Sequence, residues 1–146
     1  MNGSLKILAA AVCGLLLGLP AAQAEIPVYV FINVGTVGDE LTVFPGELTL
    51  KEGTVYKFVV SNPSDTTHIV AAPELAATVK TTELTIGSPR LDWPTPGISE
   101  GISLPAGQMI EWTFTPTKEG RYKFGCDDPV HAAAGMHAMI NIVEAL

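Results

Sequence analysis

The segment from Gly120 to Ile142 contains three kinds of side chain that bind soft metal ions. Cys126 is followed five positions later by His131, and Met136 comes five positions after that. A thiolate, an imidazole and a thioether are donors of a trigonal copper site with a weak axial sulfur ligand. The residue types and their spacing therefore predict a copper site built largely from one stretch of chain.

Strands are expected on both sides of these donors. Basic and aromatic side chains alternate over residues 121–124, which predicts a half-buried strand that ends at Cys126. A second apolar run covers residues 139–143. We therefore expect the donors to lie at the end of one strand and in the loop that leads to the next.

A trigonal copper site also needs a second imidazole from elsewhere in the chain. His68 follows an Asn-Pro-Ser-Asp turn at the start of an expected strand. It would reach the Cys126 loop if the two strand ends lie at the same pole of the domain. The alternative is a histidine of the core or of a turn, with its ring nitrogens bonded to the backbone. The residues around His68 leave both interpretations open.

The third histidine, His137, directly follows Met136. It is either an exposed residue that changes charge near neutral pH or a competing ligand that makes the site more tetragonal. Its expected outward-facing position favours the surface interpretation. Two other methionines, Met109 and Met139, lie in expected strands and are predicted to pack in the core.

Residues Met1–Ala24 are predicted to be a secretory signal peptide. Lys6 precedes an apolar run, and Ala22-Gln23-Ala24 forms a small-x-small cleavage site. A retained membrane anchor would need about 20 apolar residues, and this run is shorter. We expect a mature domain over residues 25–146, located in the periplasm or, in a photosynthetic host, in the thylakoid lumen.

The composition restricts the kinds of partner. Lys and Arg number 8 against 15 Asp and Glu, which gives a net charge of −7. This balance argues against nucleic acid or anionic lipid and permits docking to a basic protein surface. The mature domain would contain one cysteine and hence no internal disulfide, although disulfides are common in exported proteins. A lone thiol there is buried, paired with another chain or ligated, and the neighbouring donors favour ligation of Cys126.

The remainder of the chain predicts short strands separated by turns and almost no helix. Only residues 73–79 are predicted to be helical, and Ser88–Gly97 reads as a proline-rich loop. In that loop Trp93 is either a partner contact or a plug at one end of the domain. This pattern predicts an all-β, antiparallel sandwich. The expected strands cover residues 26–34, 41–44, 47–50, 54–61, 67–72, 81–86, 98–104 and 108–115.

The order of these donors resembles the cupredoxin family of small blue copper proteins, which includes plastocyanin, azurin and pseudoazurin. The stretch from Cys126 to Met136 is similar to the C-x-x-P-x-H-x-x-x-G-M loop of bacterial members, with Pro129 as the proline. The resemblance covers nearly all of the mature domain. It implies a Greek-key sandwich of about eight strands with one type 1 copper ion. The implied ligand set is His68, Cys126, His131 and Met136.

Two departures from the family pattern concern the surroundings of the site. Ile69 stands where many members have an asparagine that ties the two ligand loops together. Asp127 and Asp128 place two carboxylates next to Cys126. If they lie close to the metal, these charges favour Cu(II) and lower the reduction potential.

The predicted function is that of a soluble, monomeric one-electron carrier that exchanges electrons with redox proteins. Four protein ligands leave no open position for a substrate, so we do not expect an enzyme. His131 is expected nearest to solvent, as the electron port, and Ala132–Ala134 is either a docking patch or a tightly packed loop. The alternatives are a periplasmic copper chaperone or buffer, and a metal-free interaction module.

Overall fold

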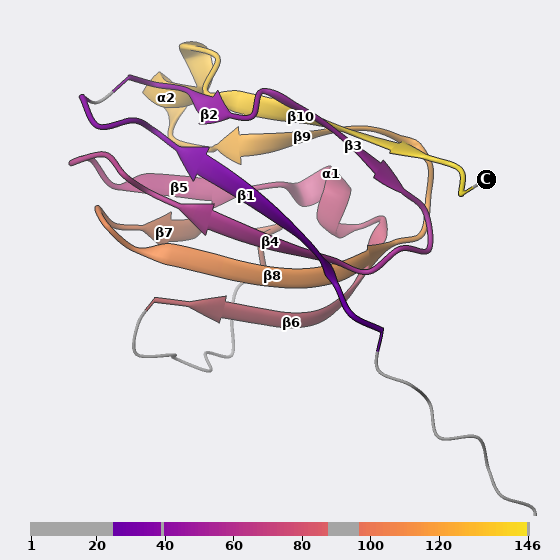
Figure 1. Ribbon diagram of the computed structural model, residues 1–146. Helices are drawn as coiled ribbons and strands as arrows, with labels where there is room; N and C mark the ends of the chain where they lie inside the picture. Colours follow the sequence, from indigo (N-terminus) through magenta and orange to yellow (C-terminus); the bar gives the residue numbers. More distant parts are fainter. Residues whose placement is uncertain (1–24, 39, 88–96, 146) are drawn as a thin grey trace, which may run out of the picture.

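Residues 25–38, 40–87 and 97–145 are the part of the chain that the computed structural model describes. They form two five-stranded sheets that pack face to face (Figure 1). The strands of sheet A are β1 (Val28–Val34), β2 (Val43–Phe44), β4 (Tyr56–Ser61), β6 (Val79–Ile86) and β8 (Met109–Pro116). Those of sheet B are β3 (Glu47–Lys51), β5 (His68–Ala71), β7 (Ile102–Leu104), β9 (Gly120–Cys126) and β10 (His137–Val143).

A cluster of aromatic rings lies in the core between the sheets. Phe58 of β4 packs edge-on against Phe114 of β8 with ring centroids 4.8 Å apart, and Trp112 lies 4.2 Å from Phe114. Phe124 of β9 reaches Phe58 from the opposite sheet at 5.9 Å. Burying each such ring contributes about 1.5–3 kcal/mol. These rings therefore hold the two sheets together and fix the strand ends that carry the site.

The predicted all-β sandwich is confirmed, but its sheets are mixed rather than antiparallel. The order is β2-β1-β4-β8-β6 in sheet A and β3-β10-β9-β5-β7 in sheet B. Strands β1 and β4 are parallel, and so are β3 and β10. The alternation of apolar residues shows which face of a strand is buried, but not which strand lies beside it. The described part contains ten strands, as many as the segments expected from the pattern, whereas the resemblance implied about eight.

Two short helices are present in the described residues where one was expected. The helix α1 (Pro73–Ala76) is shorter than the predicted range of 73–79. The helix α2 (Pro129–Ala133) lies in the segment that was expected to be a loop. Asp128 caps α2, and Pro129 opens it in the first turn, where proline is favoured. Five residues are too few for a helical period to be recognised in the sequence.

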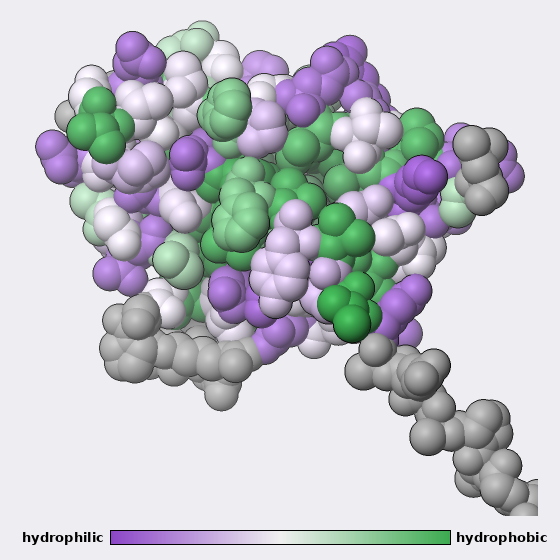
Figure 2. Space-filling model, viewed as in Figure 1, coloured by the Kyte–Doolittle hydropathy of each residue, from purple (hydrophilic) through white to green (hydrophobic). Residues whose placement is uncertain are grey.

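The outer face of sheet A carries exposed apolar side chains (Figure 2). Tyr29 and Phe31 stack on β1 with centroids 6.5 Å apart, and Phe31 is 69% exposed. Strand β1 contributes to the core through alternate residues: Ile32 and Val34 are buried, and Val30 packs against the core half-buried.

Several expectations fall outside the described residues or are wrong. The predicted signal peptide, Met1–Ala24, and most of the Ser88–Gly97 loop with Trp93 lie outside the described residues. The prediction of a core position is wrong for Met109, which is 41% exposed, and for Met139, which is half-buried and not part of the core. No helix among the described residues is long and apolar enough to cross a membrane.

Candidate metal centre

Two neighbouring strands of sheet B bring His68 and Cys126 together. Strand β5 begins at His68 and β9 ends at Cys126, and the two strands pair with Val70 opposite Cys126. The backbone N–H of Ile69 donates to Cys126 Sγ at 3.4 Å, and Asp127 N–H donates to the Ile69 carbonyl at 2.8 Å. Main-chain bonds therefore tie the two ligand segments at the position where the asparagine of many cupredoxins is absent.

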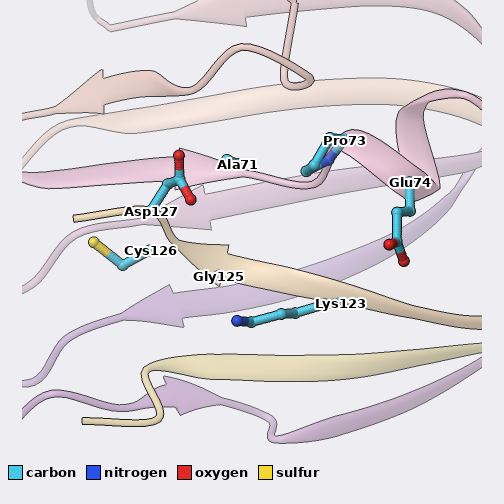
Figure 3. Close-up of a pocket in the computed structure, with 7 residues that line it drawn as sticks. All are labelled: Ala71, Pro73, Glu74, Lys123, Gly125, Cys126 and Asp127. Atoms are coloured by element: carbon cyan, nitrogen blue, oxygen red, sulfur yellow. The ribbon is translucent and has the colours of Figure 1, made fainter. Parts of the chain in front are cut away.

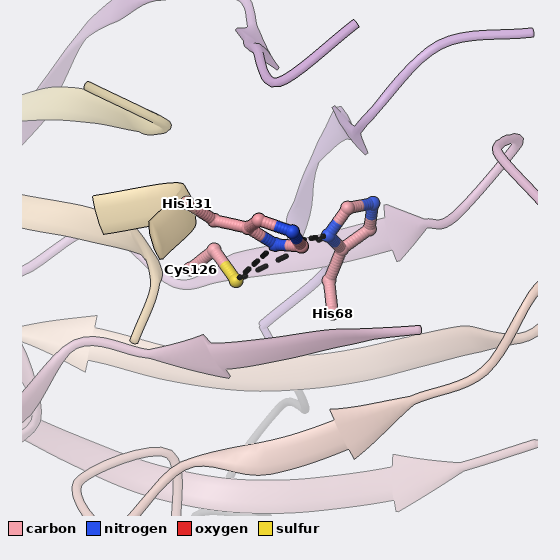
Figure 4. A group of neighbouring side chains, drawn as sticks. All are labelled: His68, Cys126 and His131. Carbon is pink, nitrogen blue, oxygen red and sulfur yellow. Dashed lines mark hydrogen bonds between the residues drawn. The ribbon is translucent and has the colours of Figure 1, made fainter. Parts of the chain in front are cut away.

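Three donor atoms converge at this end of the sandwich (Figure 4). Cys126 Sγ lies 3.5 Å from His131 Nδ1 and 4.0 Å from His68 Nδ1, and the two Nδ1 atoms are 3.3 Å apart. A point equidistant from three atoms with these separations is about 2 Å from each, the length of a metal–imidazole bond. The donor set therefore fits a trigonal copper ion in both chemistry and spacing.

The short helix α2 positions His131. Asp128 Oδ1 accepts hydrogen bonds from the main-chain N–H groups of Val130 at 2.9 Å and His131 at 3.1 Å. The bond from His131 is the main cause that lowers the pKa of Asp128 below its ordinary value. The carboxylate therefore caps the N-terminus of α2 and holds the main chain at His131 in place.

Met136 is fully buried directly behind α2. Its N–H donates to the His131 carbonyl at 3.1 Å, and its carbonyl accepts from Cys126 N–H at 3.0 Å. The main chain of the predicted axial residue is therefore bonded to both of the other loop residues in the set. Its side chain is buried in the same core cluster as Cys126.

Gly125 allows this close return of the chain. A Cβ at Gly125 would collide with the Met136 carbonyl oxygen and would lie 2.7 Å from the Cα of His137. Any other residue here would separate the start of β10 from the end of β9.

His137 is not part of the donor cluster among the described residues. It begins β10 and pairs with Gly125. The predicted exposed position is only partly correct, because the side chain is half-buried and its Nδ1 atom is buried without a hydrogen-bond partner. The close packing of β10 on Gly125 explains this burial, and nothing in the sequence alone indicates it.

A shallow hollow of ≈ 290 Å³ lies beside Cys126 on sheet B (Figure 3). Glu74 of α1 and Asp127 stand toward its two ends, and Lys123 of β9 lies between them. Its lining includes Cys126 but neither histidine of the cluster. The hollow is therefore a surface feature next to the metal site rather than the site itself.

Two buried polar residues near His68 were not singled out from the sequence. Asn62 is 1% exposed and Ser64 is 2% exposed, and Ser64 Oγ lies 2.9 Å from His68 Nε2. The Asn-Pro-Ser-Asp turn indicated a loop before the strand. It did not indicate that these side chains face inward.

The chain matches the model of a known family. The model of the copper binding proteins of the plastocyanin/azurin family matches residues 31–143, which is most of the chain and includes all four residues of the predicted ligand set. Among curated proteins, none matches the chain in sequence.

Solved structures confirm the fold. Auracyanin B is 20% identical with a TM-score of 0.55, and the match covers 82% of this chain and 92% of auracyanin B. Auracyanin A, a "blue" copper protein from the green thermophilic photosynthetic bacterium Chloroflexus aurantiacus, is 18% identical with a TM-score of 0.54, covering 80% and 99%. A multicopper oxidase from Campylobacter jejuni is 11% identical with a TM-score of 0.62, covering 86% of this chain and 32% of the oxidase.

Proposed function

Because the chain belongs to the plastocyanin/azurin family of copper binding proteins, we propose that it binds one copper ion through the predicted ligand set and carries single electrons between proteins. The observation that supports this most is the convergence of one thiol sulfur and two imidazole nitrogens, all within 4.8 Å of one another. Copper bound by such donors supplies a Cu(II)/Cu(I) couple that takes up and releases one electron.

The chain's own residues set the conditions for that role. His68 is 1% exposed and Cys126 is 3% exposed, so these side chains exclude water from the inner side of the site. The main-chain bonds around Ile69 and Met136 hold the ligand segments in place. Ligands fixed in this way move little when the charge of the site changes, which favours fast electron transfer.

We further propose that electrons enter and leave at His131. It is the half-buried member of the cluster, whereas the other two members are buried. Around it lies an apolar rim of exposed residues, Pro129, Val130, Ala133 and Ala134, and Val130 is 71% exposed. A redox partner with an apolar contact surface and basic residues at its edge would complement this rim and the net negative charge of the chain.

The burial of the predicted ligands supports a role as a carrier rather than as an enzyme. Three of the four residues in the predicted set are less than 4% exposed, and four protein ligands leave no position for a substrate. We also propose that the domain is exported, because of the apolar leader and cleavage motif in the sequence. A periplasmic protein whose mass corresponds to residues 25–146 would support export, and an uncut chain in the cytoplasm would contradict it.

The first prediction concerns the visible spectrum of the mature domain with one equivalent of Cu(II). Charge transfer from the Cys126 thiolate should give an intense blue or green colour. Cys126→Ser should abolish the colour, because a hydroxyl cannot replace the anionic sulfur. His131→Ala should change the colour by opening a coordination position, whereas His137→Ala is the matched control and should keep it.

A colourless wild-type protein with copper bound would reject the type 1 site. Two rates distinguish a carrier from a chaperone. One is the rate of electron exchange with a small redox complex, and the other is the rate of Cu(I) release to a chelator. Fast exchange with slow release supports the carrier. Slow exchange with fast release would overturn the carrier in favour of the chaperone.

A further inference from the structure

The imidazole of His68, the inner histidine of the cluster, is hydrogen-bonded to a buried chain of polar side chains. His68 Nε2 lies 2.9 Å from Ser64 Oγ, and Ser64 Oγ lies 2.7 Å from Asn62 Oδ1. The three residues are 1%, 2% and 1% exposed in that order. Each hydrogen bond has one donor and one acceptor, so the groups that only donate or only accept set the direction of the other bonds in the chain.

The direction is set at Asn62. Its Nδ2 donates to the carbonyls of Thr66 at 2.8 Å and Leu104 at 2.9 Å, and carbonyls only accept. Its Oδ1 must therefore face Ser64, where it accepts from the Ser64 main-chain N–H at 3.0 Å. The side-chain amide is thus held in one orientation, with its oxygen toward the Ser64 hydroxyl.

The Ser64 hydroxyl has one hydrogen and two acceptor positions. Ser64 Oγ lies 2.7 Å from Asn62 Oδ1, which is the length of an O–H···O bond, and an amide oxygen only accepts, so the hydrogen lies between these two oxygens. One acceptor position takes the Thr66 N–H at 3.3 Å. The remaining bond, to His68 Nε2, must then be donated by the imidazole. The hydrogen of the neutral ring is therefore on Nε2.

We propose that Ser64, oriented by Asn62, is a positioning residue that holds His68 in the Nε2–H tautomer and thereby keeps its Nδ1 lone pair directed at the metal position. Nδ1 is the atom that lies 4.0 Å from Cys126 Sγ and 3.3 Å from His131 Nδ1. The proposal rests on the proposed function for the role of His68 as a ligand. The residues Asn62, Ser64 and His68 are called the relay below.

Gly35, the residue directly after β1, covers the relay from the side of the other sheet. A Cβ on this residue would lie 2.7 Å from His68 Nε2 and 3.0 Å from Ser64 Oγ. Its φ of +84° is in the region that favours glycine, and its N–H donates to the Thr42 carbonyl at 2.8 Å. The backbone at Gly35 therefore packs against the Nε2 edge of the His68 ring, where a side chain would collide with it.

The test compares Ser64→Ala with Ser103→Ala. Ser103 is an exposed residue of β7 opposite Ile69, so the control removes the same hydroxyl from the strand next to His68 without touching the relay. The first measurement is the ¹⁵N NMR spectrum of the histidine side chains in the metal-free protein at about pH 8, where histidines are largely neutral.

In the wild type and in Ser103→Ala, the His68 ring should be protonated at Nε2 only. In Ser64→Ala it should become a mixture of both tautomers. The second measurement is Cu(I) affinity, which Ser64→Ala should lower by about 10-fold, as is typical when the partner of a metal-bound histidine is removed. Ser103→Ala should bind Cu(I) as the wild type does.

A wild-type His68 protonated at Nδ1 would overturn the proposal, and this result does not depend on whether any variant folds. An unchanged tautomer and affinity in folded Ser64→Ala would overturn it as well. The tautomer is measured without copper, so its outcome is separate from that of the carrier role. Slow electron exchange in a protein with the expected tautomer would reject the carrier and leave the relay in place.

Discussion

At the scale of single residues, the donors of the site differ in how strongly the surrounding protein holds each of them. His68 is bonded at both sides of its ring, to Ser64 and toward the cluster. Cys126 Sγ accepts a main-chain hydrogen bond from Ile69. Met136 is held through its backbone and buried by packing. Its thioether is therefore the donor whose replacement disturbs the rest of the site least.

The second prediction follows from this difference. Met136→Leu should retain copper and colour but raise the reduction potential, because removing a weak axial donor disfavours Cu(II). The change is close to volume-conserving, so the loss of folding stability should stay below about 1.5 kcal/mol. Cyclic voltammetry of the copper protein measures the potential.

Met139→Leu is the matched control for this substitution. Met139 is a half-buried residue of β10 and lies outside the core cluster. The reduction potential of Met139→Leu should equal that of the wild type. If Met139→Leu shifts the potential and Met136→Leu does not, the axial ligand has been assigned to the wrong methionine.

At the scale of elements, the helix α2 is the part of the site that depends on a single side chain. Asp128 alone provides its side-chain cap, through the N–H groups of Val130 and His131. The pKa of Asp128 is lowered, chiefly by the bond from His131, so the ionised carboxylate is favoured in the folded state. The ionised cap therefore stabilises the folded state above the ordinary value of 3.8, and this contribution is lost as the pH falls through the lowered pKa.

The third prediction is the pH dependence of this cap in the metal-free protein. Asp128→Ala should lower the free energy of unfolding at neutral pH, and the difference from the wild type should shrink as the pH falls below 3.8. Asp128→Asn keeps an acceptor oxygen without a charge, so its difference from Asp128→Ala should not vary with pH. Urea unfolding of the wild type and of both variants, from neutral pH to below 3.8, measures these free energies. If the wild type becomes more stable relative to Asp128→Ala as the pH falls, the predicted direction of this pH dependence is wrong.

At the scale of the whole molecule, the sandwich gathers its donors at one end. The ends of β9 and α2 and the start of β5 lie there, and the C-terminus lies at the opposite end (Figure 1). The donors come from positions 68 and 126–136, which the strand pairing of sheet B brings together. Copper bound at this place links segments that are far apart in the sequence, and it binds the folded chain in preference to the unfolded one.

The fourth prediction concerns copper removal. With free copper at 100 times its dissociation constant, binding should stabilise the fold by about 2.7 kcal/mol. For a domain of this size, that corresponds to a rise in melting temperature of roughly 10 °C. Calorimetry of the metal-free and copper-loaded protein measures the shift.

The control for this measurement is Cys126→Ser, which should melt at nearly the same temperature with and without copper. An equal rise in the wild type and in Cys126→Ser would mean that the metal stabilises the protein from another place.

Local pattern in the sequence determined the class of fold and the loop of the site. Alternating side chains before Cys126 predicted a strand that ends there, and the structure has β9 ending at Cys126. Burial of one strand face and the spacing of donors along one loop are properties of neighbouring residues, so they can be read without a structure.

Only the tertiary structure decided what depends on contacts between distant segments. The pairing of β5 with β9 places His68 beside Cys126, and the parallel pairs β1–β4 and β3–β10 have no local signature. The inward orientation of Ser64 and the partial burial of His137 beside Gly125 likewise depend on what packs against them. A side chain's type sets which bonds it is able to make, whereas its neighbours across the fold set which of those bonds are made.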